Sequence, residues 1–107
     1  MNNELTLRIE YHYNGNVKFK GLKNSNGQQE GLWVTFYENG NIHSRTPYAE
    51  GEANGIEERF WYNGNIRMRT PYIEGKMDGI EERFDKRGNI SETKLWEGGK
   101  LIEETQH

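Results

Sequence analysis

Hydrophobic and polar positions along the chain repeat with a period of 24 residues. Residues 31–36, 55–60 and 79–84 each begin with glycine, continue with an aliphatic residue and end in phenylalanine. A fixed period of this length predicts one small supersecondary unit that is stacked on copies of itself.

Each unit contains two extended runs with a turn between them. In the middle unit these runs are residues 56–62 and 66–72, and Asn63-Gly64-Asn65 separates them. Asn-Gly between two alternating runs is a strong hairpin signal, and a longer turn at residues 50–55 leads into the next hairpin. We therefore predict an all-β fold, an elongated antiparallel meander of about eight strands built from 24-residue β-hairpin repeats.

The repeats account for the whole chain as a single domain over residues 1–107. The first unit is the least regular, because Gly15 and Gly40 are 25 residues apart rather than 24. Irregular first and last copies are common in repeat arrays. The expected units are approximately residues 5–27, 28–51, 52–75 and 76–99, followed by a terminal strand at 100–105.

Burial of apolar side chains predicts the geometry of the hairpin loops. A two-residue loop would put Phe60 and Ile66 on opposite faces, so we expect a three-residue loop with Gly64 in the left-handed region. Pro47 and Pro71 cannot donate to a strand ladder, and the strands should part there. The expected apolar face, interrupted by Glu58 and Glu82, contains Leu32, Val34, Phe36, Ile42, Tyr48, Ile56, Phe60, Tyr62, Ile66, Met68, Tyr72, Ile80, Phe84, Ile90 and Trp96.

The opposite face is expected to carry aromatic and charged side chains. Most of its charged residues fit cross-strand ladders, whereas Trp33, Tyr37 and Trp61 would have nothing to cover them on a one-layer sheet. Trp, Tyr and Arg are also the residues most enriched at binding hot spots. The predicted partner-binding residues are Trp33, Tyr37, His43, Arg45, Arg59, Trp61, Arg67, Arg69 and Arg83.

Composition narrows the possible functions. The formal net charge is −3, so the chain has no bulk attraction for nucleic acid, and we expect no membrane partner. The three serines and three histidines are scattered without paired spacing, and we expect neither enzymatic activity nor a metal or cofactor. There is no cysteine, which is compatible with a reducing cytoplasm, and no apolar stretch approaches about 18 residues, so we expect neither a signal peptide nor a membrane-spanning helix.

A family resemblance rests on the repeated turn and the strand after it. The sequence Phe36-Tyr-Glu-Asn-Gly-Asn-Ile42, followed by Tyr48-Ala-Glu-Gly51 and Gly55-Ile56, resembles the bacterial variant of the MORN repeat. The resemblance covers most of residues 9–102 and implies hairpins that line up into an elongated curved sheet. Bacterial and phage proteins of this kind include the YwqK-like antitoxin family. That similarity implies a cytoplasmic protein that neutralises another protein by occlusion, and it assigns no catalytic residue.

Our leading hypothesis is a non-catalytic protein-binding inhibitor, either an antitoxin or immunity protein or a phage-encoded blocker of a bacterial defence enzyme. Its partner would be another protein, a toxin or a defence enzyme. One alternative is a scaffold for phospholipid headgroups or a membrane surface. A second alternative is a structural repeat protein that forms a homodimer through its sheet edges or aromatic face.

Overall fold

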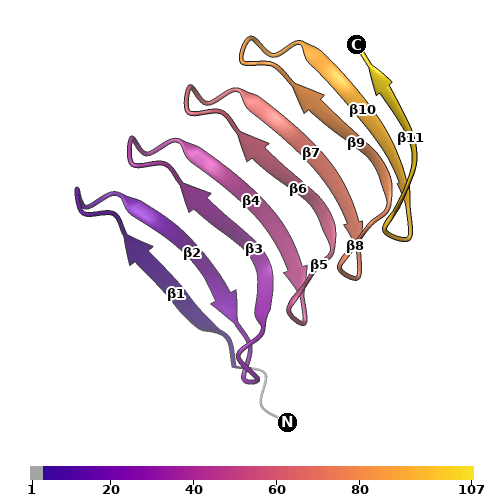
Figure 1. Ribbon diagram of the computed structural model, residues 1–107. Helices are drawn as coiled ribbons and strands as arrows, with labels where there is room; N and C mark the ends of the chain where they lie inside the picture. The colour runs from indigo at the N-terminus through magenta and orange to yellow at the C-terminus, as the bar shows by residue number, and fades with distance from the viewer. Residues whose placement is uncertain (1–3) are drawn as a thin grey trace.

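The structure is a computed structural model that describes residues 4–107, and it consists of one antiparallel sheet (Figure 1). Nine strands follow one another in chain order across the sheet, and two short strands, β5 and β8, extend its outer turns. The molecule measures 45 × 37 × 13 Å, the thickness of a single layer. The strands are β1 Thr6–Tyr11, β2 Val17–Lys23, β3 Gln29–Phe36, β4 Ile42–Ala49, β5 Glu52–Ala53, β6 Gly55–Phe60, β7 Ile66–Ile73, β8 Lys76–Met77, β9 Gly79–Phe84, β10 Ile90–Glu97 and β11 Lys100–Gln106.

This architecture confirms the predicted all-β meander of hairpin repeats. The 11 strands exceed the expected number because β5 and β8, of two residues each, form within the outer turns. Over residues 4–107 there is no helix, and hence none long and apolar enough to cross a membrane.

The hairpin loops have the predicted length and glycine conformation. The Trp61 N–H donates to the Asn65 carbonyl at 2.8 Å, which leaves three residues in the loop between them. Gly64 ends this loop with φ +95°, a value that favours glycine. The Asn-Gly signal therefore specified the turn locally.

A bulge in each hairpin changes which side chains share a face. In the middle hairpin Phe60 pairs with Ile66, whereas Arg59 pairs with Met68, so Arg67 is an extra residue in β7. Directly paired residues of antiparallel strands point to the same side. Ile66 therefore lies with Phe60, and Met68 lies with Arg59 on the opposite face.

This bulge corrects the expected membership of the two faces. The prediction assumed unbroken alternation along each second strand, but the extra residue shifts the alternation by one position beyond it. His43 and Ser91 are the equivalent extra residues in β4 and β10. As a result Tyr48, Met68, Tyr72 and Trp96 leave the expected apolar face, and Arg45 and Arg69 join it.

The outer turns separate neighbouring hairpins at the prolines, as expected. Between β4 and β6 only Ser44–Arg59 and Arg45–Glu58 are directly paired. Toward the outer turn, the carbonyl of Pro47 accepts a hydrogen bond from the Asn54 N–H at 2.9 Å. The ring nitrogen of Pro47 has no hydrogen to donate.

The sheet has no second layer and no hydrophobic core. Among residues 4–107 no hydrophobic side chain is buried. Stability must therefore come from backbone ladders and side-chain contacts along the two faces rather than from an enclosed interior.

One outer turn allows a direct test of backbone strain. Glu74 has φ +47° and precedes Gly75 at φ +85°, so this two-residue loop has the primed geometry that favours Asn-Gly. A side chain other than Gly, Asn or Asp in that region costs roughly 1 kcal/mol. Glu74→Asn is expected to raise the free energy of unfolding by about 0.5–1 kcal/mol in urea denaturation.

The matched control for this prediction is Glu103→Asn in β11. Glu103 is exposed, like Glu74, but its φ is not positive. An equal gain from both substitutions, or none from Glu74→Asn, would contradict the assignment of strain to the turn.

Candidate functional site

On one face of the sheet, side-chain hydrogen bonds join neighbouring hairpins. Thr46 Oγ1 donates to Glu57 Oε2 at 2.8 Å, and Thr70 Oγ1 donates to Glu81 Oε2 at 3.1 Å. Thr46, Thr70 and Glu81 are only 5%, 2% and 3% exposed. We call this the ladder face; its members include Trp33, Thr35, Tyr37, His43, Ser44, Thr46, Tyr48, Glu57, Arg59, Trp61, Arg67, Met68, Thr70, Tyr72, Glu81, Arg83, Glu92, Lys94 and Trp96.

Ring donors beside the hairpin loops continue this cross-linking. In three successive hairpins, the residue just after the first strand donates to the backbone carbonyl of the phenylalanine in the next hairpin. These donors are thus used within the fold. The contacts are His12 Nε2 to Phe36 O at 2.8 Å, Tyr37 OH to Phe60 O at 2.7 Å and Trp61 Nε1 to Phe84 O at 3.3 Å.

The asparagines of each loop join it to the next one. Asn63 and Asn65 both donate their side-chain N–H groups to the Lys86 carbonyl, at 3.1 and 2.8 Å. The earlier loops make the same pair of contacts with Glu38 O and Tyr62 O. The repeated Asn-Gly-Asn sequence is therefore a structural clamp between hairpins.

Two of the three predicted arginines of the ladder face, Arg59 and Arg83, lie in ion pairs. Arg59 Nε is 3.2 Å from Glu57 Oε1 on the same strand. Arg83 lies 3.6 Å from a Glu81 oxygen and 3.8 Å from a Glu92 oxygen. These contacts agree with the ladder interpretation, and each carboxylate reduces the charge that its arginine could offer to a partner.

The predicted aromatic residues Tyr37 and Trp61 form two contacts of their own, and Trp33 lies beside Phe19 instead. The Tyr37 ring meets the His43 ring edge to face, with centroids 4.7 Å apart. The Arg67 guanidinium lies over Trp61 at 4.8 Å, and Lys86 Nζ lies 5.6 Å from the same ring. Trp61 thus has cations over its ring within the fold.

The protonation of His43, on this face, makes the folding stability depend on pH. Burial is the main cause that lowers the pKa of His43 from its ordinary 6.5, and the charges of Arg59 and Arg67 lower it further. The unfolded chain therefore binds more protons than the folded one as pH falls below 6.5, and stability falls with it.

We expect the free energy of unfolding to decrease as pH falls from 6.5 through the lowered pKa of His43, and His43→Gln to reduce that slope. Urea denaturation between neutral and mildly acidic pH measures both. His107→Gln, at the exposed end of the chain, is the control. An unchanged slope in His43→Gln would contradict the assignment.

The junction between the first and second hairpins departs from the ladder at Trp33. This residue occupies the position of Glu57 and Glu81, and its indole lies across Gly21 and donates to the Leu22 carbonyl at 2.9 Å. A Cβ atom on Gly21 would lie 2.1 Å from the indole ring. Glycine is thus required there by the tryptophan that crosses it.

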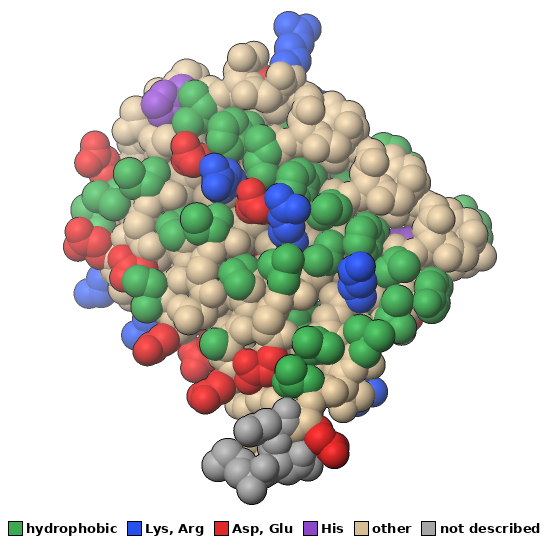
Figure 2. All heavy atoms as spheres, turned by 180° about the vertical axis from the view of Figure 1, so that it is seen from behind, with side chains coloured by type: hydrophobic (Ala, Val, Ile, Leu, Met, Phe, Trp, Pro, Cys, Tyr) green, Lys and Arg blue, Asp and Glu red, His purple; other side chains and the backbone are tan. Residues whose placement is uncertain are grey.

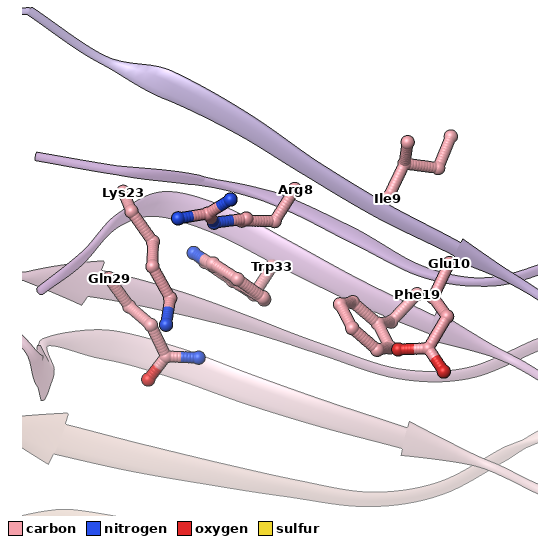
Figure 3. Close-up of a pocket in the computed structure, with 7 residues that line it drawn as sticks. All are labelled: Arg8, Ile9, Glu10, Phe19, Lys23, Gln29 and Trp33. Carbon is pink, nitrogen blue, oxygen red and sulfur yellow. The ribbon is translucent and has the colours of Figure 1, made fainter. Parts of the chain in front are cut away.

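A shallow pocket lies at Trp33 on this face (Figure 3). Its cavity volume is about 260 Å³. Trp33 forms its floor beside Phe19, with the two ring centroids 6.0 Å apart, while Arg8 and Lys23 lie toward one end and Glu10 toward the other.

The opposite face exposes its aliphatic side chains. Leu32, Ile56 and Ile80 are equivalent residues of three hairpins and are 54%, 50% and 61% exposed. Figure 2 shows this face, on which hydrophobic side chains surround a few charged ones. We call it the aliphatic face; its members include Leu22, Leu32, Val34, Phe36, Ile42, Ile56, Phe60, Ile66, Ile80, Phe84, Ile90 and Leu95.

A row of charged residues crosses the middle of the aliphatic face. Arg45 Nε is 2.8 Å from one oxygen of Glu58, and Arg69 Nε is 3.5 Å from the other. The Arg45 guanidinium also lies over the Phe60 ring at 5.2 Å. Register places these residues side by side on adjacent strands, in the order Lys20, Val34, Arg45, Glu58, Arg69, Glu82 and Thr93.

The nine predicted binding residues are therefore divided between the two faces. Arg45 and Arg69 lie on the aliphatic face with Glu58, and the other seven lie on the ladder face. The intrusion of Glu58 and Glu82 into the apolar face was predicted correctly. The exposure of Leu32, Ile56 and Ile80 was missed, because the sequence does not show whether a second layer covers an apolar face.

Comparison with known protein families matches two segments of the chain, residues 29–50 and 53–74. Both match the MORN repeat variant. Each matched segment covers one hairpin loop and the strands on both sides of it. No significant match was found among curated proteins or among solved structures.

The described hairpins present no clustered metal ligands. Within residues 4–107 no group of three or more His, Asp or Glu side chains is placed to hold a metal ion. What the described arrangement offers chemically is a broad surface, apolar at its flanks and charged along its middle.

Proposed function

We propose that the chain is a non-catalytic protein-binding inhibitor that neutralises a partner protein by covering its functional surface with the aliphatic face. The supporting observation is the half exposure of Leu32, Ile56 and Ile80 on a sheet without a second layer. Contiguous exposed apolar surface usually marks an interaction site. The partner would be a toxin, for an antitoxin or immunity protein, or a defence enzyme, for a phage-encoded blocker, and the activity would take place in the cytoplasm.

The charged row suggests what such a partner presents. Arg45, Glu58 and Arg69 alternate in sign across adjacent strands, between two apolar flanks. A matching surface would carry an apolar patch crossed by acidic and basic groups in the complementary order. Such pairing contributes specificity and correct register more than affinity.

The ladder face supports a smaller role in binding. Its arginines and ring donors already bond within the sheet, so a partner would have to compete with those contacts. A role in partner contacts at the edge of the interface remains a prediction for the ladder-face residues Trp33, Tyr37, His43, Arg59, Trp61, Arg67 and Arg83.

Capture from the producing cells, with matched variants, tests the proposal. Tagged wild-type chain is expected to retain one protein stoichiometrically, and Ile56→Asp with Ile80→Asp should release it. Lys94→Gln, on the ladder face and outside the predicted binding residues, is the control and should retain it. The captured protein should lose its activity when the purified wild-type chain is added and keep it with the double variant.

Two results would contradict the inhibitor proposal. One is the absence of any stoichiometric protein whose retention depends on Ile56 and Ile80. The other is binding to anionic vesicles that the same double variant abolishes, which would favour the membrane-scaffold alternative. The row of mixed charge argues against that alternative, because lipid-binding segments are polybasic.

A further inference from the structure

We propose that a second copy of the chain covers the aliphatic face when no partner is bound, in a face-to-face dimer whose two-fold axis runs along the strands between β6 and β7. The inference rests on the proposed function for the choice of docking face. It adds a specific occupant and a geometry.

The size of the face is adequate for a stable dimer. With the axis between β6 and β7, eight of the nine strands in the continuous path face a strand of the second copy. With spacing of about 4.8 Å and about six residues of about 3.3 Å each, they give an overlapping face of about 760 Å². A standard interface buries about 800 Å² per partner. Two such sheets packed face to face would form a sandwich with strands nearly aligned.

The order of the charges selects the symmetry axis. A two-fold axis parallel to the strands reverses the order of the row, so an axis between β6 and β7 places Arg45 opposite Glu82 of the second copy and Glu58 opposite Arg69 of that copy. The reciprocal contacts give four pairs of opposite charge. An axis perpendicular to the strands would instead place each charge opposite itself.

The charges within one chain are incompletely balanced, and the dimer corrects this. Glu58 is shared by Arg45 and Arg69, so two cations face one carboxylate. Among the described residues, Glu82 has no ion pair of its own, although Arg69 is its direct neighbour on β7. In the proposed dimer the carboxylate of Glu82 meets the Arg45 guanidinium of the other copy.

The apolar flanks also match under this axis. Rotation about the strand direction keeps each residue at the same height along the strands, so the flank that contains Leu32, Ile56 and Ile80 meets the same flank of the second copy. The side chains that are half exposed in one chain would be covered in two. Figure 2 shows the surface that would be buried.

Charge-reversed variants test this arrangement by light scattering and sedimentation velocity, from low micromolar to several hundred micromolar protein. The wild type is expected at twice 12.6 kDa. Glu58→Arg and Arg69→Glu should each weaken self-association at least about tenfold, because each places like charges opposite one another. Mixed in equal amounts, the two variants should form a heterodimer, since their rows are complementary.

Controls make the result specific. Arg67→Glu, on the ladder face, should remain dimeric, and circular dichroism checks that every variant is folded. Glu58→Gln and Arg69→Gln should weaken the dimer without forming a preferred heterodimer. A monomeric wild type at all concentrations would overturn the dimer, and normal dimerisation of Arg69→Glu would overturn this axis. Neither outcome bears on capture of a different protein, so the two proposals fail separately.

Discussion

Gly21→Thr is expected to lower the free energy of unfolding by about 3 kcal/mol, among the largest effects of any single substitution in the described chain. The new Cβ atom would lie within 2.1 Å of the Trp33 ring, so the indole must leave its position across β2. It would lose its hydrogen bond to the Leu22 carbonyl and its stacking against Phe19.

The repeat itself supplies the compensating change. In the next two hairpin junctions, Thr46 with Glu57 and Thr70 with Glu81 occupy the places of Gly21 with Trp33. Gly21→Thr combined with Trp33→Glu should therefore recover most of the lost stability, to within about 1 kcal/mol of the wild type.

Urea denaturation of the two single variants and the double variant measures this coupling. Additive losses in the double variant would contradict the proposed equivalence of the two kinds of contact. A small loss in Gly21→Thr alone would show that Trp33 moves aside at little cost.

Glu81→Ala is expected to cost about 2–3 kcal/mol, because it removes an acceptor that two buried or half-buried donors share. Glu81 accepts from Thr70 Oγ1 and from Trp96 Nε1, each at 3.1 Å, and its side chain is 4% exposed. Glu81→Gln keeps an acceptor oxygen and should cost about 1 kcal/mol.

The equivalent residue in the preceding hairpin is a built-in control. Glu57 also accepts from a threonine, but its side chain is 13% exposed and no tryptophan donates to it. Glu57→Ala should therefore cost less, about 1 kcal/mol. Equal losses at the two positions, measured by urea denaturation, would contradict the role of burial and of Trp96.

Departures from the repeat were visible in the sequence but could not be interpreted there. Trp33 replaces the glutamate of the later units, and Asp85 replaces the aromatic residue that follows each phenylalanine. In the structure Asp85 accepts backbone N–H groups of its own loop, from Arg87 and Asn89, whereas Tyr37 and Trp61 donate to the next hairpin. The role of each of these residues can be assigned only when its contacts with the neighbouring hairpin are known.

The candidate site was predicted only in part for the same reason. Arg45 and Arg69 were expected beside Trp61, but one bulge residue per hairpin moves them to the other face. Nothing in the alternation of residues 66–72 marks Arg67 as the extra residue. Its position follows from the pairing of Arg59 with Met68 across the hairpin.

The amino-acid sequence by itself determined the hairpin, its three-residue loop with a positive φ at Gly64, and the 24-residue period, because these depend on residues that are close along the chain. Tertiary structure decided which side chains share a face and which stay exposed. A bulge is defined only by the strand opposite it, and exposure depends on whether a second layer exists. The free aliphatic face, on which the proposed binding depends, is therefore a property of the assembled sheet.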